Sequence, residues 1–194
     1  MIDLVLASAS PRRADLLRSA GLRIHVRPSA CDESPRPHEP AVAHALRIAR
    51  AKLDAAWADG RPDVPVLAAD TEVWSDLMAE PLGKPRDRKH AALVLRSLLG
   101  GHHFVTTAWA LGRPGRDPQV RYETTRVWMR DVDEAELAAY LDTDEWRDKA
   151  GGYGIQGHAA GLVTRIEGSY TNVVGLPLAQ VLEALAGART GSSR

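Results

Sequence analysis

Hydroxyl and guanidinium side chains cluster near the start of the chain, directly after a short apolar run at residues 4–6. Pro11 stands where the first residue of a helix is expected, with Ser10 before it as the N-cap. A strand that turns into a helix start aims free backbone N–H groups at one point, where anions bind. Arg12 and Arg13 add two permanent cations whose guanidinium groups can fork onto phosphate oxygens. The stretch predicts an anion site, unless it is simply a solvated helix start with two surface arginines.

A carboxylate and a lysine in the next segments are also candidates for a site. The apolar run at residues 64–69 predicts a central strand that ends on Asp70. Open α/β sheets carry their chemistry at strand ends, although an aspartate there can also cap a turn. Residues 41–57 keep the apolar spacing of a helix, and Lys52 falls at the margin of that stripe. Its ammonium group either reaches a cleft or extends into solvent.

Three loops carry further candidates. A proline-rich loop at residues 28–40 contains Glu33, and its prolines hold the loop extended. A turn between prolines carries Lys84. The glycine-dense stretch at residues 150–157 contains Gln156 and fits neither an ordinary helix nor a strand. This stretch lets the backbone approach a ligand closely, or it is only an irregular loop.

Composition limits the classes of protein that fit. With 194 residues and 44% hydrophobic content, the chain can bury one substantial core or two small lobes that share a cleft. The 25 Lys and Arg residues balance the 25 Asp and Glu residues, so no overall field favours nucleic acid or an anionic membrane. The single cysteine, Cys31, excludes an internal disulfide. We find no signal peptide and no apolar run of about 18 residues, so we expect a cytoplasmic protein without nucleic-acid or membrane partners.

Several catalytic signatures are absent from the sequence. Gly83 and Lys84 are followed by Pro85, which excludes a Walker-type nucleotide loop, and no G-x-G-x-x-G follows the first strand. There is no H-E-x-x-H, and the adjacent His102 and His103 would face opposite sides of a strand. There is also no G-x-S-x-G. These absences disfavour P-loop, dinucleotide-binding, zinc and serine-hydrolase chemistry.

The remaining apolar patterns indicate a mixed sheet. Residues 22–26 and 162–166 predict short strands. Residues 103–111 and 120–129 predict a long hairpin with its turn at Pro114. A hairpin of this kind adds antiparallel strands, so the sequence predicts a mixed sheet.

Helix signals and the chain's ends complete the domain prediction. Asp87 and Asp133 are expected to cap helices, and a last helix follows Pro177. Residues 1–187 are predicted to form a single domain, and residues 188–194 a frayed tail.

Five stretches, taken together and in order, are similar to the motifs of the Maf family of nucleoside triphosphate pyrophosphatases. They are SASPRR at residues 8–13, ADT at 69–71, GKP at 83–85, DKAGGYGIQG at 148–157 and GSYTNVVGLP at 168–177. The resemblance extends from about residue 4 to residue 185. It implies an α/β, Maf/ITPase-like fold of two lobes around a curved mixed sheet, with a central cleft.

The resemblance also implies a reaction and the residues that perform it. Maf proteins cleave a nucleoside triphosphate between the α and β phosphorus atoms with a divalent metal, Mg²⁺ or Mn²⁺, and release pyrophosphate. By position, Asp70 corresponds to the catalytic carboxylate, and Glu33 and Asp70 to the metal ligands. Phosphate binding is implied for Ser8, Arg13, Lys52 and Lys84, and base selection for Arg12, Thr71 and Gln156. The base-selecting set resembles the subgroup that acts on dTTP and UTP, and a modified pyrimidine nucleotide is a further candidate substrate.

Three departures from the family pattern stay open, one of which is the unusual composition of the loop at residues 75–82 that carries the chain to Lys84, and several alternatives stay open as well. Glu72 and Trp74 stand where aliphatic residues are usual, and Glu72 can compete as a metal ligand. Asp70 can accept a proton from water, hold the metal, or do both. One alternative function is a nucleotide-binding regulator of cell division without turnover. Another is selectivity for 7-methyl-GTP, against which Arg12 argues because it cannot stack as an aromatic ring does on a cationic purine. The expected partner is the nucleoside triphosphate, with a homodimer as a frequent assembly of the family.

Overall fold

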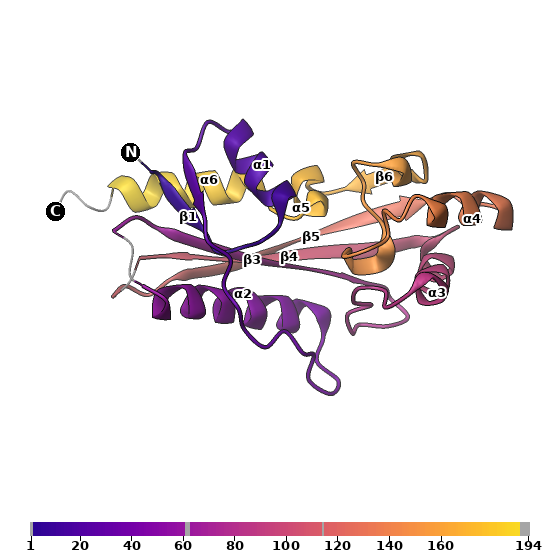
Figure 1. The fold of residues 1–194 in the computed structure, drawn as a ribbon, viewed down its shortest axis with the longest axis horizontal. Coiled ribbons are helices and arrows are strands. Elements are labelled where there is room, and N and C mark those ends of the chain that lie inside the picture. The colour runs from indigo at the N-terminus through magenta and orange to yellow at the C-terminus, as the bar shows by residue number, and fades with distance from the viewer. Residues whose placement is uncertain (1, 61–62, 114, 191–194) are drawn as a thin grey trace.

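The chain is built on one six-stranded mixed sheet with the strand order β2-β1-β3-β4-β5-β6 (Figure 1). The computed structural model describes residues 2–60, 63–113 and 115–190. β1 pairs in parallel with β2 and β3, and the other neighbours pair antiparallel, which confirms the predicted α/β class with a mixed sheet. The strands are β1 (Leu4–Leu6), β2 (Ile24–Val26), β3 (Val66–Trp74), β4 (His102–Gly112), β5 (Gln119–Met129) and β6 (Val163–Glu167).

Helices cover both faces of the sheet (Figure 1). α2 packs on the face to which Val66 and Ala68 of β3 point, whereas α1 and α6 share a core with Leu67 and Ala69. Successive residues of a strand point to opposite faces, so the apolar run at the start of β3 supplies both layers. The helices are α1 (Pro11–Ser19), α2 (Ala41–Ala58), α3 (Arg88–Leu98), α4 (Glu134–Asp142), α5 (Tyr170–Val174) and α6 (Leu178–Thr190), with 3₁₀ turns η1 (Ala150–Gly152) and η2 (His158–Gly161).

A further apolar core lies toward the other end of the long strands β3 to β5. There Val73, Val105 and Val127 meet Leu95 of α3 and Tyr153 of the glycine-dense loop. One lobe therefore surrounds β1, β2, α1, α2 and α6, and the other contains α3, α4 and β6 (Figure 1). The long strands join the two lobes.

Asp70 lies in the middle of β3, and the prediction that it ends the strand is wrong. β3 pairs with β4 from Val66 to Trp74, but with β1 only at Val66 and Leu67. β1 stops early because the chain turns away and enters α1 at Pro11. Beyond Leu67, one edge of β3 has no neighbouring strand within the described residues, and Asp70 lies on this free edge.

The predicted helix starts are confirmed in position. The side chains of Asp87 and Asp133 cap α3 and α4, each by accepting a backbone N–H three residues further on. Ser10 precedes α1 as predicted, but its hydroxyl forms no capping bond. Its backbone N–H instead donates to Ser8 Oγ over 3.2 Å. The tight turn between β1 and α1 is therefore held by Ser8.

The remaining differences concern the hairpin turn, one helix and the C-terminus. β4 and β5 form the predicted hairpin, and its turn residue Pro114 lies outside the described residues. The short helix α5 had no counterpart in the sequence prediction. α6 continues to Thr190, beyond residue 188, where the tail was predicted to begin, and residues 191–194 lie outside the described part. Among the helices that the structure describes, none is long and apolar enough to cross a membrane.

Candidate active site

A cavity of about 630 Å³ opens along the free edge of β3, with walls from both lobes. Of the nine predicted site residues, eight line it: Arg12, Arg13, Glu33, Lys52, Asp70, Thr71, Lys84 and Gln156. Ser8 is buried and is not among the lining residues. Segments from α1, the proline-rich loop, α2, β3 and the glycine-dense loop thus meet at one hollow.

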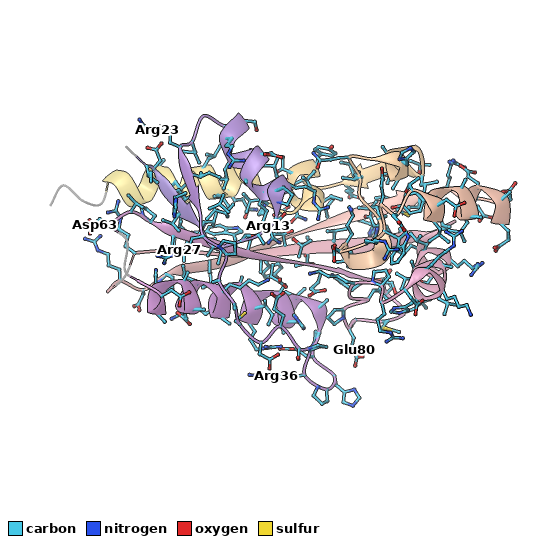
Figure 2. The ribbon with its side chains drawn as sticks, viewed as in Figure 1. Arg13, Arg23, Arg27, Arg36, Asp63 and Glu80 are labelled. Atoms are coloured by element: carbon cyan, nitrogen blue, oxygen red, sulfur yellow. The ribbon has the colours of Figure 1, made fainter. Side chains whose placement is uncertain are left out.

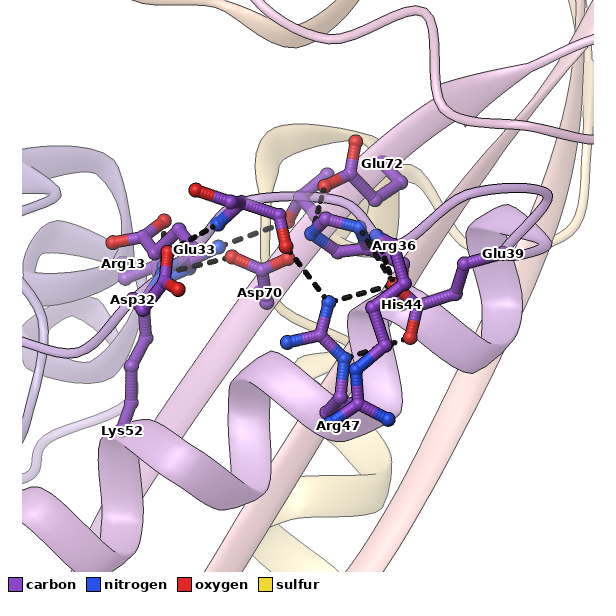
Figure 3. A network of polar contacts seen from close by, with 12 residues as sticks. Arg13, Asp32, Glu33, Arg36, Glu39, His44, Arg47, Lys52, Asp70 and Glu72 are labelled. Carbon is purple, nitrogen blue, oxygen red and sulfur yellow. Dashed lines mark hydrogen bonds and ion pairs between the residues drawn. The ribbon is translucent and has the colours of Figure 1, made fainter.

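Lys52 joins the two carboxylates for which the motif resemblance implies metal binding. Its Nζ donates to Asp70 Oδ1 over 2.8 Å and to Glu33 Oε2 over 2.9 Å (Figure 3). Lys52 and Asp70 are buried, whereas Glu33 is exposed at the rim of the cavity. Of the two orientations considered for Lys52, the structure shows the inward one, because the apolar face of α2 packs on β3 and carries the lysine stem with it.

Arg13 is buried near the middle of the molecule and is fixed by three hydrogen bonds (Figure 2). Its Nε donates to the carbonyl of Gly175 over 2.8 Å, its Nη1 to Ser8 Oγ over 3.0 Å, and its Nη2 to Thr71 Oγ1 over 2.9 Å. Gly175 has a φ of 129°, a left-handed backbone that favours glycine and directs this carbonyl. Burial lowers the pKa of Arg13, and the nearby Asp70 opposes that shift. The guanidinium is therefore oriented before any ligand arrives.

His44 of α2, which the sequence did not single out, lies in a polar group with Glu72 and Glu39. Its Nε2 lies 3.5 Å from Glu72 Oε1, and its Nδ1 lies 3.5 Å from Glu39 Oε2 (Figure 3). Arg47 holds Glu39 with two hydrogen bonds of 2.7 and 2.6 Å. Burial lowers the pKa of His44, while burial and the neighbouring Asp70 raise the pKa of Glu72. The only available sequence signal was that His44 lies eight residues, about two helical turns, before Lys52.

The donor atoms of this region fit a divalent cation. One possible ligand atom from each of His44, Asp70 and Glu72 lies within 4.8 Å of the others. Within the described residues, the buried Asp70 Oδ2 has no hydrogen-bond partner. Buried polar atoms usually have partners, and oxygen and imidazole nitrogen atoms are common metal ligands. Glu33 adds a further carboxylate beside Asp70 through their shared bond to Lys52.

The glycine-dense loop presents Gln156 to the cavity. Gly151 has a φ of 70°, and a Cβ atom there would lie 2.9 Å from Val73 Cγ1, so glycine is required for the loop to pack on β3. Tyr153 is buried and anchors the loop in the core, while the exposed Gln156 lines the cavity. Arg12 and Gln156 also line a smaller adjoining hollow of about 260 Å³. Two of the three predicted base-selecting side chains therefore line the same hollow.

Comparison with known proteins assigns the chain to a family. The model of the family described as Maf-like protein matches residues 3–188. The chain belongs to this family. Two relatives of this Maf-like chain are named dTTP/UTP pyrophosphatase. The relative from Geobacter sp. (strain M21) is 45% identical over 186 residues, which cover 94% of each chain. The relative from Nitrosomonas europaea is 42% identical over 192 residues, which cover 93% of this chain and 91% of the relative.

A solved structure also shares the fold of this Maf-like chain. It is a HAM1 protein from Coxiella burnetii, with a TM-score of 0.53 and 17% sequence identity, and the match covers 98% of this chain and 100% of that chain. At this identity the likeness concerns the fold alone. It confirms the fold class expected from the motif resemblance.

Proposed function

We propose that this chain is a pyrophosphatase that hydrolyses dTTP and UTP to the nucleoside monophosphate and pyrophosphate. The observation that carries the proposal is the cavity at the edge of β3, which gathers Arg12, Arg13, Lys52, Lys84 and Asp70 around one space. Membership of the Maf-like family supports the reaction, and the names of the two relatives support the pyrimidine substrates.

The cations of the cavity neutralise the phosphates in this proposal. A triphosphate brings about four negative charges, which repel the attacking oxygen until they are screened. Arg13 donates three of its five N–H groups to described protein atoms, so two remain for phosphate oxygens. Lys84 is exposed on its loop and can follow the phosphate chain. Ser8 contributes by holding Arg13 in place.

Asp70 is the proposed general base. Lys52 binds its Oδ1, and Oδ2 has no hydrogen-bond partner within the described residues. A carboxylate held at one oxygen keeps the lone pairs of the other oxygen, which can accept a proton from the attacking water and can also bind a metal ion. When bound through Asp70 and Glu33, Mg²⁺ or Mn²⁺ would screen the phosphate charge and polarise the bond that breaks.

The pyrimidine is proposed to lie against Arg12, Thr71 and Gln156. The side chain of Gln156 offers both a donor and an acceptor, and the edge of uracil or thymine presents one of each. Thr71 Oγ1 accepts from Arg13 and bonds to Thr107 Oγ1 over 2.9 Å, so the hydroxyl is held in one orientation. A modified pyrimidine nucleotide that keeps this edge would fit the same contacts.

The same proposal covers the organisation of the protein. We expect residues 1–187 to work as a single domain, because the cavity takes lining residues from both lobes. We expect a cytoplasmic enzyme, since its nucleotide substrates occur there, and a homodimer. Light scattering of the purified chain measures the assembly directly.

The test is a nucleotide panel with product identification. Purified full chain is incubated with dTTP, UTP, CTP, dATP, GTP and 7-methyl-GTP in Mg²⁺ or Mn²⁺, and products are separated by anion exchange. We expect equal amounts of monophosphate and pyrophosphate, with dTTP and UTP at least about tenfold faster than the purine nucleotides. Release of orthophosphate would refute the reaction class. Tight nucleotide binding without turnover would favour a regulator, and preference for 7-methyl-GTP would favour the other specificity.

A further inference from the structure

We propose that His44 and Glu72 join Asp70 as ligands of a transition-metal site in this cavity. The chain would then bind Mn²⁺, Co²⁺ or Zn²⁺ more tightly than Mg²⁺. This inference rests on the metal-binding role proposed above for Asp70, but it does not depend on which nucleotide is hydrolysed.

The fold brings the three side chains together from two elements. Asp70 and Glu72 are two residues apart on β3 and therefore point to the same face of the sheet. α2 covers that face and carries His44 about two turns before Lys52 (Figure 3). The side chains of His44, Asp70 and Glu72 are only 4%, 10% and 11% exposed. All three line the cavity, so an ion can reach them.

The spacing of the donor atoms suits a shared ion better than direct bonds between the side chains. The distance of 3.5 Å between His44 Nε2 and Glu72 Oε1 is longer than a normal hydrogen bond. Ligand atoms about 2 Å from one cation lie about 3 to 4 Å from each other, close to the spread of at most 4.8 Å seen here. Asp70 Oδ2 is buried and has no hydrogen-bond partner within the described residues, which leaves it available as a ligand.

A carboxylate behind His44 supports the assignment independently. Histidine ligands of metals usually present their second ring nitrogen to a carboxylate or carbonyl, which fixes the orientation of the ring. Here Nδ1 of His44 lies 3.5 Å from Glu39 Oε2, and Arg47 holds the Glu39 carboxylate at both oxygens. Nδ1 faces this carboxylate at more than normal hydrogen-bond distance, and Nε2 on the other side of the ring faces Glu72 and the cavity (Figure 3).

The imidazole decides which metals are preferred. Mg²⁺ favours oxygen ligands and retained waters, whereas imidazole nitrogen favours later transition metals such as Co²⁺ and Zn²⁺. A site built from carboxylates alone would lack this preference. His44 is the only one of the three side chains that supplies nitrogen, so it should control selectivity more than affinity for Mg²⁺.

The test measures metal binding without nucleotide. Binding of Co²⁺ and Mg²⁺ to the full chain is followed by calorimetry, and the Co²⁺-loaded protein is examined by proton NMR for the strongly shifted exchangeable N–H resonance of a coordinated imidazole. We expect Co²⁺ to bind at least about tenfold more tightly than Mg²⁺. His44→Gln should weaken Co²⁺ binding by roughly ten- to a hundredfold, change Mg²⁺ binding little, and remove the shifted resonance. The control His102→Gln, at an exposed histidine paired with Asp76, should behave as the wild type.

Two results would overturn the inference: equal binding of Co²⁺ and Mg²⁺ by the wild type, or unchanged Co²⁺ binding by His44→Gln. Circular dichroism checks that each variant is folded. Glu72→Gln tests the ligand residue on β3 and should weaken the binding of both Co²⁺ and Mg²⁺. If the wild type shows no Co²⁺ preference but still releases pyrophosphate, this inference alone fails. If His44 binds Co²⁺ but no nucleotide is hydrolysed, the proposed function alone fails.

Discussion

His103 on β4 should make the protein less stable as the pH falls. Its side chain is fully buried, and its Nε2 lies 2.7 Å from the hydroxyl of Tyr153. Its Nδ1 has no hydrogen-bond partner within the described residues, so a protonated ring would leave one N–H unsatisfied. Burial, with a smaller contribution from His102, lowers the pKa of His103 from 6.5 to about 4.

The size and sign of the effect follow from proton linkage. In the unfolded chain the pKa of His103 returns to about 6.5, so below that pH the unfolded state binds a proton that the folded state excludes. Stability is therefore lost between about pH 6.5 and about pH 4. At about 1.4 kcal/mol per pH unit, the loss is about 2 kcal/mol at pH 5 and approaches about 3 kcal/mol at lower pH.

Urea unfolding of the wild type and His103→Gln at about pH 7.5 and about pH 5 measures this loss. Glutamine does not titrate and can still bond to the Tyr153 hydroxyl. The free energy of unfolding of the wild type, relative to the variant, should fall by about 2 kcal/mol between the two pH values. His102→Gln should keep the wild-type loss, because it retains His103. Equal losses in the wild type and His103→Gln would refute the reasoning.

Three further substitutions test the site and its support. Asp70→Asn should lower kcat by roughly a hundred- to ten-thousandfold, measured by pyrophosphate release, while the nucleotide Kd measured by calorimetry changes only a few-fold. If the variant keeps its turnover, another carboxylate is the general base. Gln156→Glu should raise KM for dTTP and UTP about tenfold or more with a smaller change in kcat, because a carboxylate offers no hydrogen-bond donor to the pyrimidine. An unchanged KM would contradict recognition of the pyrimidine by Gln156. Asn172→Asp should lower the free energy of unfolding, measured with urea, by about 3 kcal/mol or more, since the fully buried amide donates to Val105 O and Thr125 Oγ1 over 2.9 and 3.0 Å. A variant as stable as the wild type would show that these hydrogen bonds contribute little.

The sequence predicts the elements whose signals are local. α2 and the β4–β5 hairpin follow from apolar spacing and turn residues within each segment. The end of β3 is not a local property. Its apolar run stops at Ala69, but pairing with β4 extends the strand to Trp74 and leaves Asp70 in the middle. The length of β3 depends on a partner strand about forty residues later, which a local reading does not include.

The site was predictable to a different extent. From residue chemistry alone, Lys52 could equally extend into solvent and Asp70 could equally cap a turn. The motif resemblance predicted that these residues belong to one site, and the cavity contains both. His44 carried no comparable signal, because a lone histidine on an amphipathic helix is usually a packing residue. Only the packing of α2 on β3 brings it to Glu72. The phosphate role that the resemblance implies for Ser8 stays a prediction; in the structure its hydroxyl accepts a hydrogen bond from Arg13, and Ser8 is not among the cavity-lining residues.

Side chains alternate between the two faces of β3, so a single strand can hold a cation for a charged ligand on each face. Asp70 points toward α2 and bonds to Lys52, whereas the next residue, Thr71, points to the opposite face and bonds to Arg13. A triphosphate that crosses this edge meets one buried cation on each face. A shift of one residue in the pairing would exchange these faces and separate each cation from its partner. The register that pairs Asp70 with Ala108 is therefore part of the proposed catalytic arrangement.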